Sequence, residues 1–167
     1  LNSGSLVFSS SSLIDFSDVE LADVLNVLRS KKDKFGVLNP AESLSEMVRF
    51  LKRERQEFPC YGGYKYFFMD VNFNVYRCDF WSKPMGTIEE FAATPFVRDD
   101  CTKCMSVCYR DSGVFLNLPV AIGDAIGHTR RGHLGRAART LAAPSVRKSA
   151  KSLMTEWKTL KRLAKTP

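Results

Sequence analysis

The sequence predicts an α/β protein in three successive parts. Residues 1–57 are expected to form the C-terminal section of a partial (β/α) barrel, residues 58–119 a small domain made of a β-hairpin and a helix, and residues 120–167 a basic, partly helical tail. Short apolar runs alternate with helical apolar spacing in the first part. Aromatic and β-branched residues gather in the second, and Arg, Lys and Ala dominate the third.

The first 57 residues are predicted to form, in order, a strand, a helix, a second strand and a second helix. Residues 6–8 are an apolar run suited to a buried strand, and residues 19–29 carry apolar side chains at i, i+3, i+4 and i+7. Residues 37–38 are a second, shorter strand candidate. Pro40 then favours the start of a helix over residues 41–55. Such alternation is typical of the closing section of a larger parallel barrel or sheet.

The second part carries a hairpin signal. Residues 64–69 and 75–78 are rich in aromatic and β-branched side chains, and the residues between them are rich in Asp and Asn, which tolerate left-handed turn conformations. Farther along, Thr87 and Glu90 have the spacing of a capping box, which predicts a short helix there. A hairpin followed by a helix is therefore expected between residues 58 and 100.

The net charge of +7 is concentrated in the third part. Residues 129–167 hold eleven Lys/Arg and one acid, which leaves fourteen Lys/Arg against seventeen Asp/Glu, or −3, in residues 1–128. A basic tail of this kind can contact nucleic acid or an anionic membrane surface through charge alone. A solvated, partly helical extension is the more common case and is the favoured interpretation.

The sequence contains neither a transmembrane run of eighteen apolar residues nor a signal peptide. These features favour a cytoplasmic protein. The first residue is not Met, so the chain is expected to be a piece of something longer or an incomplete reading frame.

The five cysteines predict a metal site. Five is odd, and clustered thiols in a cytoplasmic chain favour metal binding over disulfides. A C-x2-C pair suits one tetrahedral metal or two irons of one cluster. Because a hairpin returns the chain to its start, the two cysteines that flank it are expected to converge. The alternative is that these thiols are buried as small hydrophobic side chains. The candidate ligands are Cys60, Cys78, Cys101, Cys104 and Cys108.

The surroundings of the cysteines favour a [4Fe–4S] cluster over zinc. Structural zinc modules usually contain two C-x2-C or C/H knuckles, whereas this chain has one, and His128 and His133 lie far away in the tail. The many aromatic and Met residues near the cysteines would exclude water from a cluster. A structural zinc module with a basic nucleic-acid-binding tail is the alternative.

The motifs of residues 58–112 resemble a known domain. Cys60-x-Gly-Gly, then Asp70-x3-Asn74-Val75-x2-Cys78, a helix led by Gly86, and Cys101-x2-Cys104-x3-Cys108 are similar to the SPASM/twitch domain, the C-terminal extension of radical SAM enzymes. The resemblance implies an auxiliary [4Fe–4S] cluster in an oxidoreductase, serving electron transfer or substrate anchoring. Five cysteines rather than seven suggest the shorter twitch type.

The resemblance also assigns the ligands. Cys60, Cys78, Cys101 and Cys104 match the twitch ligands, which leaves Cys108 spare or as a substitute. Where the family has a turn glycine, this chain has Phe73, with Asn72 and Asn74 available for the left-handed position. The C-x3-C-x2-C loop that binds the SAM-cleaving cluster is absent, so S-adenosyl-L-methionine is expected only in the complete parent enzyme, beside an N-terminal barrel.

Three further residues lie next to the cysteines. Arg77, Tyr109 and Arg110 could hydrogen-bond cluster sulfur or bind an anionic substrate, or could be ordinary surface residues. The aspartates of this region form no acid/base pair that the sequence reveals. No motif for nucleotide binding or hydrolysis is present.

Overall fold

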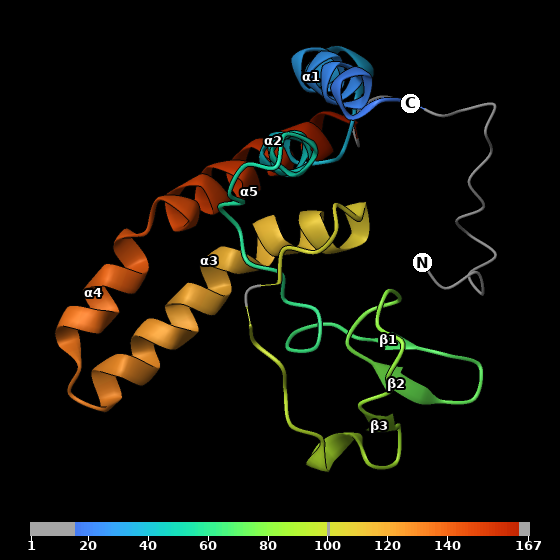
Figure 1. Cartoon of the computed structure of the whole chain (residues 1–167). Coiled ribbons are helices and arrows are strands. Elements are labelled where there is room, and N and C mark those ends of the chain that lie inside the picture. The colour runs from blue at the N-terminus through green and yellow to red at the C-terminus, as the bar shows by residue number, and fades with distance from the viewer. Residues whose placement is uncertain (1–15, 100, 164–167) are drawn as a thin grey trace. The chain divides into compact units, whose positions relative to one another are not determined.

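The computed structural model describes residues 16–99 and 101–163 (Figure 1). The chain divides into two compact units. We call residues 61–101 the hairpin unit, and residues 18–60 together with 102–163 the helical unit. The chain therefore passes between units directly after Cys60 and directly after Cys101. These boundaries differ from the expected ones at residues 57/58 and 119/120.

The helical unit consists of five helices, α1 (Asp18–Phe35), α2 (Ala41–Leu51), α3 (Val107–Arg130), α4 (Leu134–Ala142) and α5 (Pro144–Leu163). In Figure 1, α1 lies beside α2, and α3 lies beside both α4 and α5. Ala22, Val48 and Leu51 form a small buried cluster between α1 and α2, against which Met105 packs. Residues on both sides of the hairpin unit in the sequence thus share one core.

The hairpin unit contains the expected hairpin. Strand β1 (Phe68–Met69) pairs antiparallel with β2 (Asn74–Tyr76), and β2 pairs antiparallel with β3 (Gly86–Thr87). The prediction of a hairpin is confirmed, although its strands are shorter than the aromatic runs. The expected helix after Gly86 is a single 3-10 turn, Phe91–Ala93. Half of the expected capping box forms, since the N–H of Thr87 donates to Oε2 of Glu90 at 3.1 Å.

The hairpin turn depends on Asp70. Its carboxylate accepts the N–H groups of Asn72 and Asn74, both at 2.9 Å, and the hydroxyl of Tyr76 at 3.0 Å. Phe73 itself takes the left-handed conformation, with φ of 63°. The expectation that Asn72 or Asn74 would do so was wrong. The bonds that Asp70 makes on either side of Phe73 hold this backbone in place, at a cost that a glycine would not incur.

The first part of the chain differs from the expected order of strand, helix, strand and helix. The strand predicted at residues 37–38 does not form; this prediction was wrong. Gly36 has φ of 64° and the N–H of Val37 bonds the carbonyl of Lys32 at 3.1 Å, so this segment terminates α1. The strand predicted at residues 6–8 lies outside the described residues. The two predicted helices are confirmed, with α2 ending at Leu51 rather than residue 55.

The predicted tail is part of the helical core. Helix α3 runs through the expected boundary at residue 119, and α5 packs against α3 and α2. Lys32 of α1 and Glu156 of α5 form a buried ion pair with Nζ and Oε2 2.7 Å apart. The interpretation of residues 120–167 as a solvated extension is therefore wrong for the described residues. None of the described helices is long and apolar enough to cross a membrane.

A serine of α5 bonds two backbone groups inside α3, next to a proline. Pro119 lies within α3 and has no N–H to donate. One residue earlier, the N–H of Leu118 donates to the hydroxyl of Ser149 at 3.1 Å, and that hydroxyl donates to the carbonyl of Val114 at 2.6 Å. The Ser149 hydroxyl thus bridges the N–H of Leu118 and the carbonyl of Val114. Such an insertion is a recognised cause of helix bending.

Candidate metal centre

The five cysteines are divided between the two units. Cys78 and Cys101 belong to the hairpin unit, whereas Cys60, Cys104 and Cys108 belong to the helical unit. Cys60 is buried, Cys108 is exposed, and the other three are intermediate. All five thiols are free of disulfides. The donor chemistry that a thiolate-bound metal requires is therefore present, and each unit is described by itself below.

In the hairpin unit, an ion pair connects the backbone beside Cys78 to Cys101. Arg77 is 2% exposed, and its guanidinium makes two hydrogen bonds to the carboxylate of Asp99, one of them with Nη1 and Oδ2 2.6 Å apart. The same carboxylate accepts the backbone N–H of Cys101. The Asp99 carboxylate thus bonds both the side chain of Arg77, which precedes Cys78, and the backbone N–H of Cys101.

The same ion pair sets the electrostatics of this region. The Arg77 guanidinium holds the pKa of Asp99 below its ordinary value, and the N–H of Cys101 acts in the same direction. The guanidinium also lies over the Trp81 ring, 5.1 Å from its centroid. From the sequence, Arg77 was expected to hydrogen-bond cluster sulfur or bind an anionic substrate, or to be a surface residue. Its burial and its pairing with Asp99 show a structural bond that the sequence did not reveal.

In the helical unit, α3 holds the segment that leads to Cys60. Arg110 is 2% exposed and donates from Nη1 to Oε1 of Gln56 at 2.9 Å and to the carbonyl of Phe58 at 3.4 Å. One turn later, Gly113 meets Pro59 so closely that a Cβ there would lie 2.9 Å from the Pro59 carbonyl oxygen. The last residues before Cys60 are thus fixed to the beginning of α3.

A buried carboxylate secures the other side of this segment. Glu46 of α2 is 1% exposed and accepts the N–H groups of Glu57, at 3.0 Å, and Phe58, at 3.2 Å. Arg110 and Glu46 therefore hold the chain before Cys60 between α2 and α3. The reading of Arg110 and Tyr109 as surface residues was wrong, since both are buried.

Cys104 and Cys108 lie at the start of α3. Cys104 lies two positions before Ser106, the N-cap residue of the helix, and Cys108 lies in the first turn. Cys108 and Arg110 are two positions apart in the sequence, which corresponds to about 200° around the helix. Cys108 is therefore turned away from the face that contacts residues 56–59, which agrees with its exposure.

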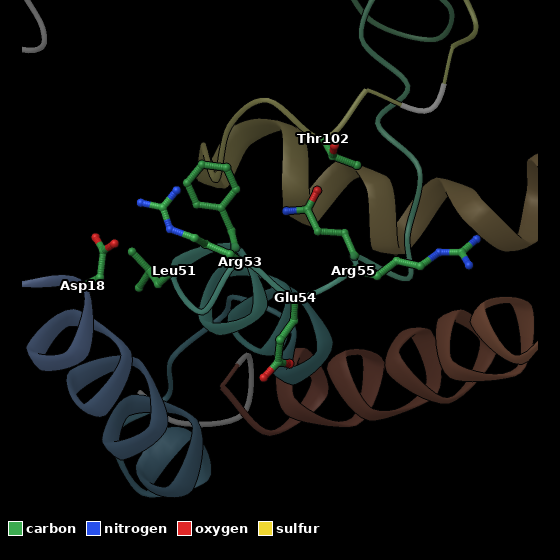
Figure 2. Close-up of a pocket in the computed structure, with 8 residues that line it drawn as sticks. Asp18, Leu51, Arg53, Glu54, Arg55 and Thr102 are labelled. Atoms are coloured by element: carbon green, nitrogen blue, oxygen red, sulfur yellow. The ribbon is translucent and has the colours of Figure 1, made fainter.

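A cavity of about 400 Å³ lies near the N-terminus of α1 and the C-terminus of α2 (Figure 2). Phe50 and Leu51 supply apolar surface, while two arginines and two carboxylates surround it. Figure 2 shows the side chains of Arg53 and Arg55 extending in different directions. Because cations and anions are equal in number, the cavity selects no ligand charge. The charged residues that line it are Asp18, Arg53, Glu54 and Arg55.

Within residues 16–99 and 101–163, no three His, Cys, Asp or Glu side chains form a group that could hold a metal ion. Thiolates are the type of ligand that iron–sulfur and zinc sites use. The chain matches no family model, no curated protein and no solved structure. Any function must therefore be argued from the chain itself.

Proposed function

We propose that this chain binds a [4Fe–4S] cluster through Cys60, Cys78, Cys101 and Cys104. One observation carries the proposal: the Asp99 carboxylate joins buried Arg77, the neighbour of Cys78, to the backbone of Cys101. Because desolvation of a buried arginine offsets much of its attraction to a carboxylate, net stability alone is a weak explanation for this pair. Ordering the residues beside two thiols is an additional explanation.

The helical unit supplies parallel support. Glu46 and Arg110 together order residues 56–59, which end at Cys60, and Arg110 belongs to the same helix start that follows Cys104. Metal ligands are usually held in orientation by hydrogen bonds just outside them. Each unit therefore contains at least one buried charged side chain that forms hydrogen bonds close in sequence to a proposed ligand. Cys108, exposed on α3, is the cysteine left out.

A cluster bound by these thiolates would supply one-electron transfer, or would anchor a substrate if one iron were open. In line with the twitch resemblance, we propose that the chain is the auxiliary-cluster part of a radical SAM oxidoreductase. S-adenosyl-L-methionine would bind only in the complete enzyme, beside an N-terminal barrel that carries C-x3-C-x2-C. The chain's own residues would order the thiols and shield them from water.

The test is a set of alanine substitutions in protein purified without oxygen. The unsubstituted protein should be brown, with about four iron and four sulfide per chain. Cys60→Ala, Cys78→Ala, Cys101→Ala and Cys104→Ala should each lose most of the iron, because a missing thiolate opens one iron to water. Cys108→Ala is the matched control and should retain it. Greater iron loss in Cys108→Ala than in Cys101→Ala would overturn the ligand assignment.

A further inference from the structure

A groove runs between α3 and α4 in the helical unit. Its lining residues all follow the last cysteine of the chain, Cys108, by more than ten positions. The groove has a volume of about 300 Å³. The two helices lie side by side and are joined by residues 131–133 (Figure 1). Residues that line the groove include Ile122, Ala125, Ile126 and Arg130 from α3, and Ala138 and Leu141 from α4.

The walls of the groove leave large apolar side chains exposed. Ile122 is 44% exposed, Ile126 is 49% exposed and Leu141 is 44% exposed. Isolated apolar residues on a surface are common, but a contiguous set that lines a depression marks an interaction site. Ile122 and Ile126 are one helical turn apart, so they present a continuous apolar ridge along α3.

The charge around the groove is mostly positive. Asp124 lies between the lining residues Ile122 and Ala125, whereas residues 125–155, which include α4 and both of its flanking segments, contain no Asp or Glu. They contain five Arg and two Lys, namely Arg130, Arg131, Arg136, Arg139, Arg147, Lys148 and Lys151. Of these, Lys148 pairs with Glu57. Arg130 lines the groove and forms no ion pair with any residue that the structure describes. The groove therefore combines an apolar lining with an available cation and a positive field.

We propose that this α3–α4 groove docks an acidic amphipathic helix of a partner protein. A channel between two adjacent helices accepts the apolar ridge of a third helix, whose side chains at i, i+3, i+4 and i+7 fit between those of the walls. Carboxylates beside that ridge would pair with Arg130 and gain from the surrounding positive charge. The proposal does not depend on the cluster.

The concave shape favours a helix over a membrane or a nucleic acid. An interfacial membrane helix inserts a protruding apolar face into lipid, whereas here the apolar side chains line a depression. Nucleic acid binding uses cations that contact phosphates and does not require an apolar lining. Both alternatives depend on total charge far more than on Ile126.

The probe is a fluorescein-labelled peptide of about 14 residues, with Leu at i, i+3, i+4 and i+7 and Glu at most other positions, a length that covers the nine residues of α4. A peptide of the same composition in scrambled order has the same charge without the apolar ridge. Fluorescence anisotropy with the full chain should show saturable binding of the patterned peptide, at least about tenfold tighter than the scrambled one.

Three variants locate the binding. Ile126→Glu places a charge in the groove at a half-exposed position, and should weaken binding about tenfold or more. Arg130→Glu should weaken it about three- to tenfold. Arg136→Glu is the matched control: it makes the same change in net charge, but lies about 150° around α4 from the centre of the stripe formed by Ala137, Ala138 and Leu141, and should change binding less than about twofold. Circular dichroism establishes that each variant is folded.

Several results would overturn the proposal. These are absence of binding, equal affinity for the two peptides, or equal effects of Arg130→Glu and Arg136→Glu. Tighter binding to phosphatidylserine vesicles or to a single-stranded oligonucleotide than to the patterned peptide would assign the basic surface to those ligands instead. Because no cysteine is involved, this outcome is independent of iron content.

Discussion

Replacing Ser149 with alanine tests how much its two hydrogen bonds to the backbone of α3 stabilise the fold. The Ser149 side chain is fully buried, and its hydroxyl is the partner of both the Leu118 N–H and the Val114 carbonyl. Val114 is also fully buried. Each backbone group left without a partner in such surroundings costs about 1–3 kcal/mol. Alanine recovers about 0.5 kcal/mol through its higher helix propensity, and part of the lost bonding returns if Leu118 moves toward Val114. The expected loss in the free energy of unfolding is about 2 kcal/mol.

Urea unfolding followed by far-UV circular dichroism measures this loss. Ser112→Ala is the matched control, because the Ser112 hydroxyl donates to the carbonyl of Cys108 at 2.7 Å within α3 and bridges no second helix. It should change the free energy of unfolding by less than about 0.5 kcal/mol. Equal, small losses in the two variants would refute the claim that the bonds from Ser149 to Leu118 and Val114 stabilise the fold.

Three further predictions concern the segments beside the cysteines. Gly113→Ala should destabilise the chain by about 1–3 kcal/mol, because its Cβ would lie 2.9 Å from the Pro59 carbonyl oxygen, whereas Gly123→Ala, with open space around it, should be neutral or stabilising; urea unfolding distinguishes them. The pKa of Asp99 is lowered in the folded state by Arg77, so its stabilising effect is complete above the ordinary value of 3.8 and is lost as pH falls through the lowered pKa. Acid titration of Trp81 fluorescence in a Trp157→Phe background should show this transition, and Asp99→Asn should remove it; an unchanged profile would contradict the Arg77–Asp99 account. Finally, the reconstituted chain incubated with dithionite and S-adenosyl-L-methionine should release no 5′-deoxyadenosine above a cluster-free control, and release with turnover would contradict the assignment as an auxiliary domain.

Local patterns predicted the elements whose causes are local. The apolar spacing of α1, the proline before α2 and the Asp/Asn-rich turn of the hairpin each act within a few residues, and each element formed. The errors occurred where a local signal was weak or was outweighed by packing. Two apolar residues at 37–38 suggested a strand, but Gly36 and the bond from Val37 to Lys32 made them a helix terminus.

Long-range pairing was not visible in the sequence. The composition of residues 120–167 suggested a solvated tail because its cations outnumber its acids, yet Glu156, one of its two acids, pairs with Lys32 in the core. Pro119 lies inside α3, where the hydroxyl of Ser149 on α5 bonds the N–H of Leu118 and the carbonyl of Val114. Small polar residues at buried positions of α5, Ser149 and Ser152 among them, were the available signal.

The sequence predicted which residues belong to the candidate site, but not how they are arranged in space. Cysteine spacing identified the thiols, whereas the bonds that order their neighbours, from Arg77 to Asp99 and from Arg110 to Gln56, join residues 22 and 54 positions apart. No periodic pattern encodes such pairs. The burial of an arginine next to each group of cysteines is a three-dimensional fact that sequence spacing does not express.

Metal and sulfide analysis of the chain purified without oxygen tests the central claim most directly. The account predicts about four iron and four acid-labile sulfide per chain, with broad absorption at about 400 nm from thiolate-to-iron charge transfer. A colourless protein that carries one zinc per chain and no sulfide would contradict it, and would assign the same thiolates to a structural zinc site.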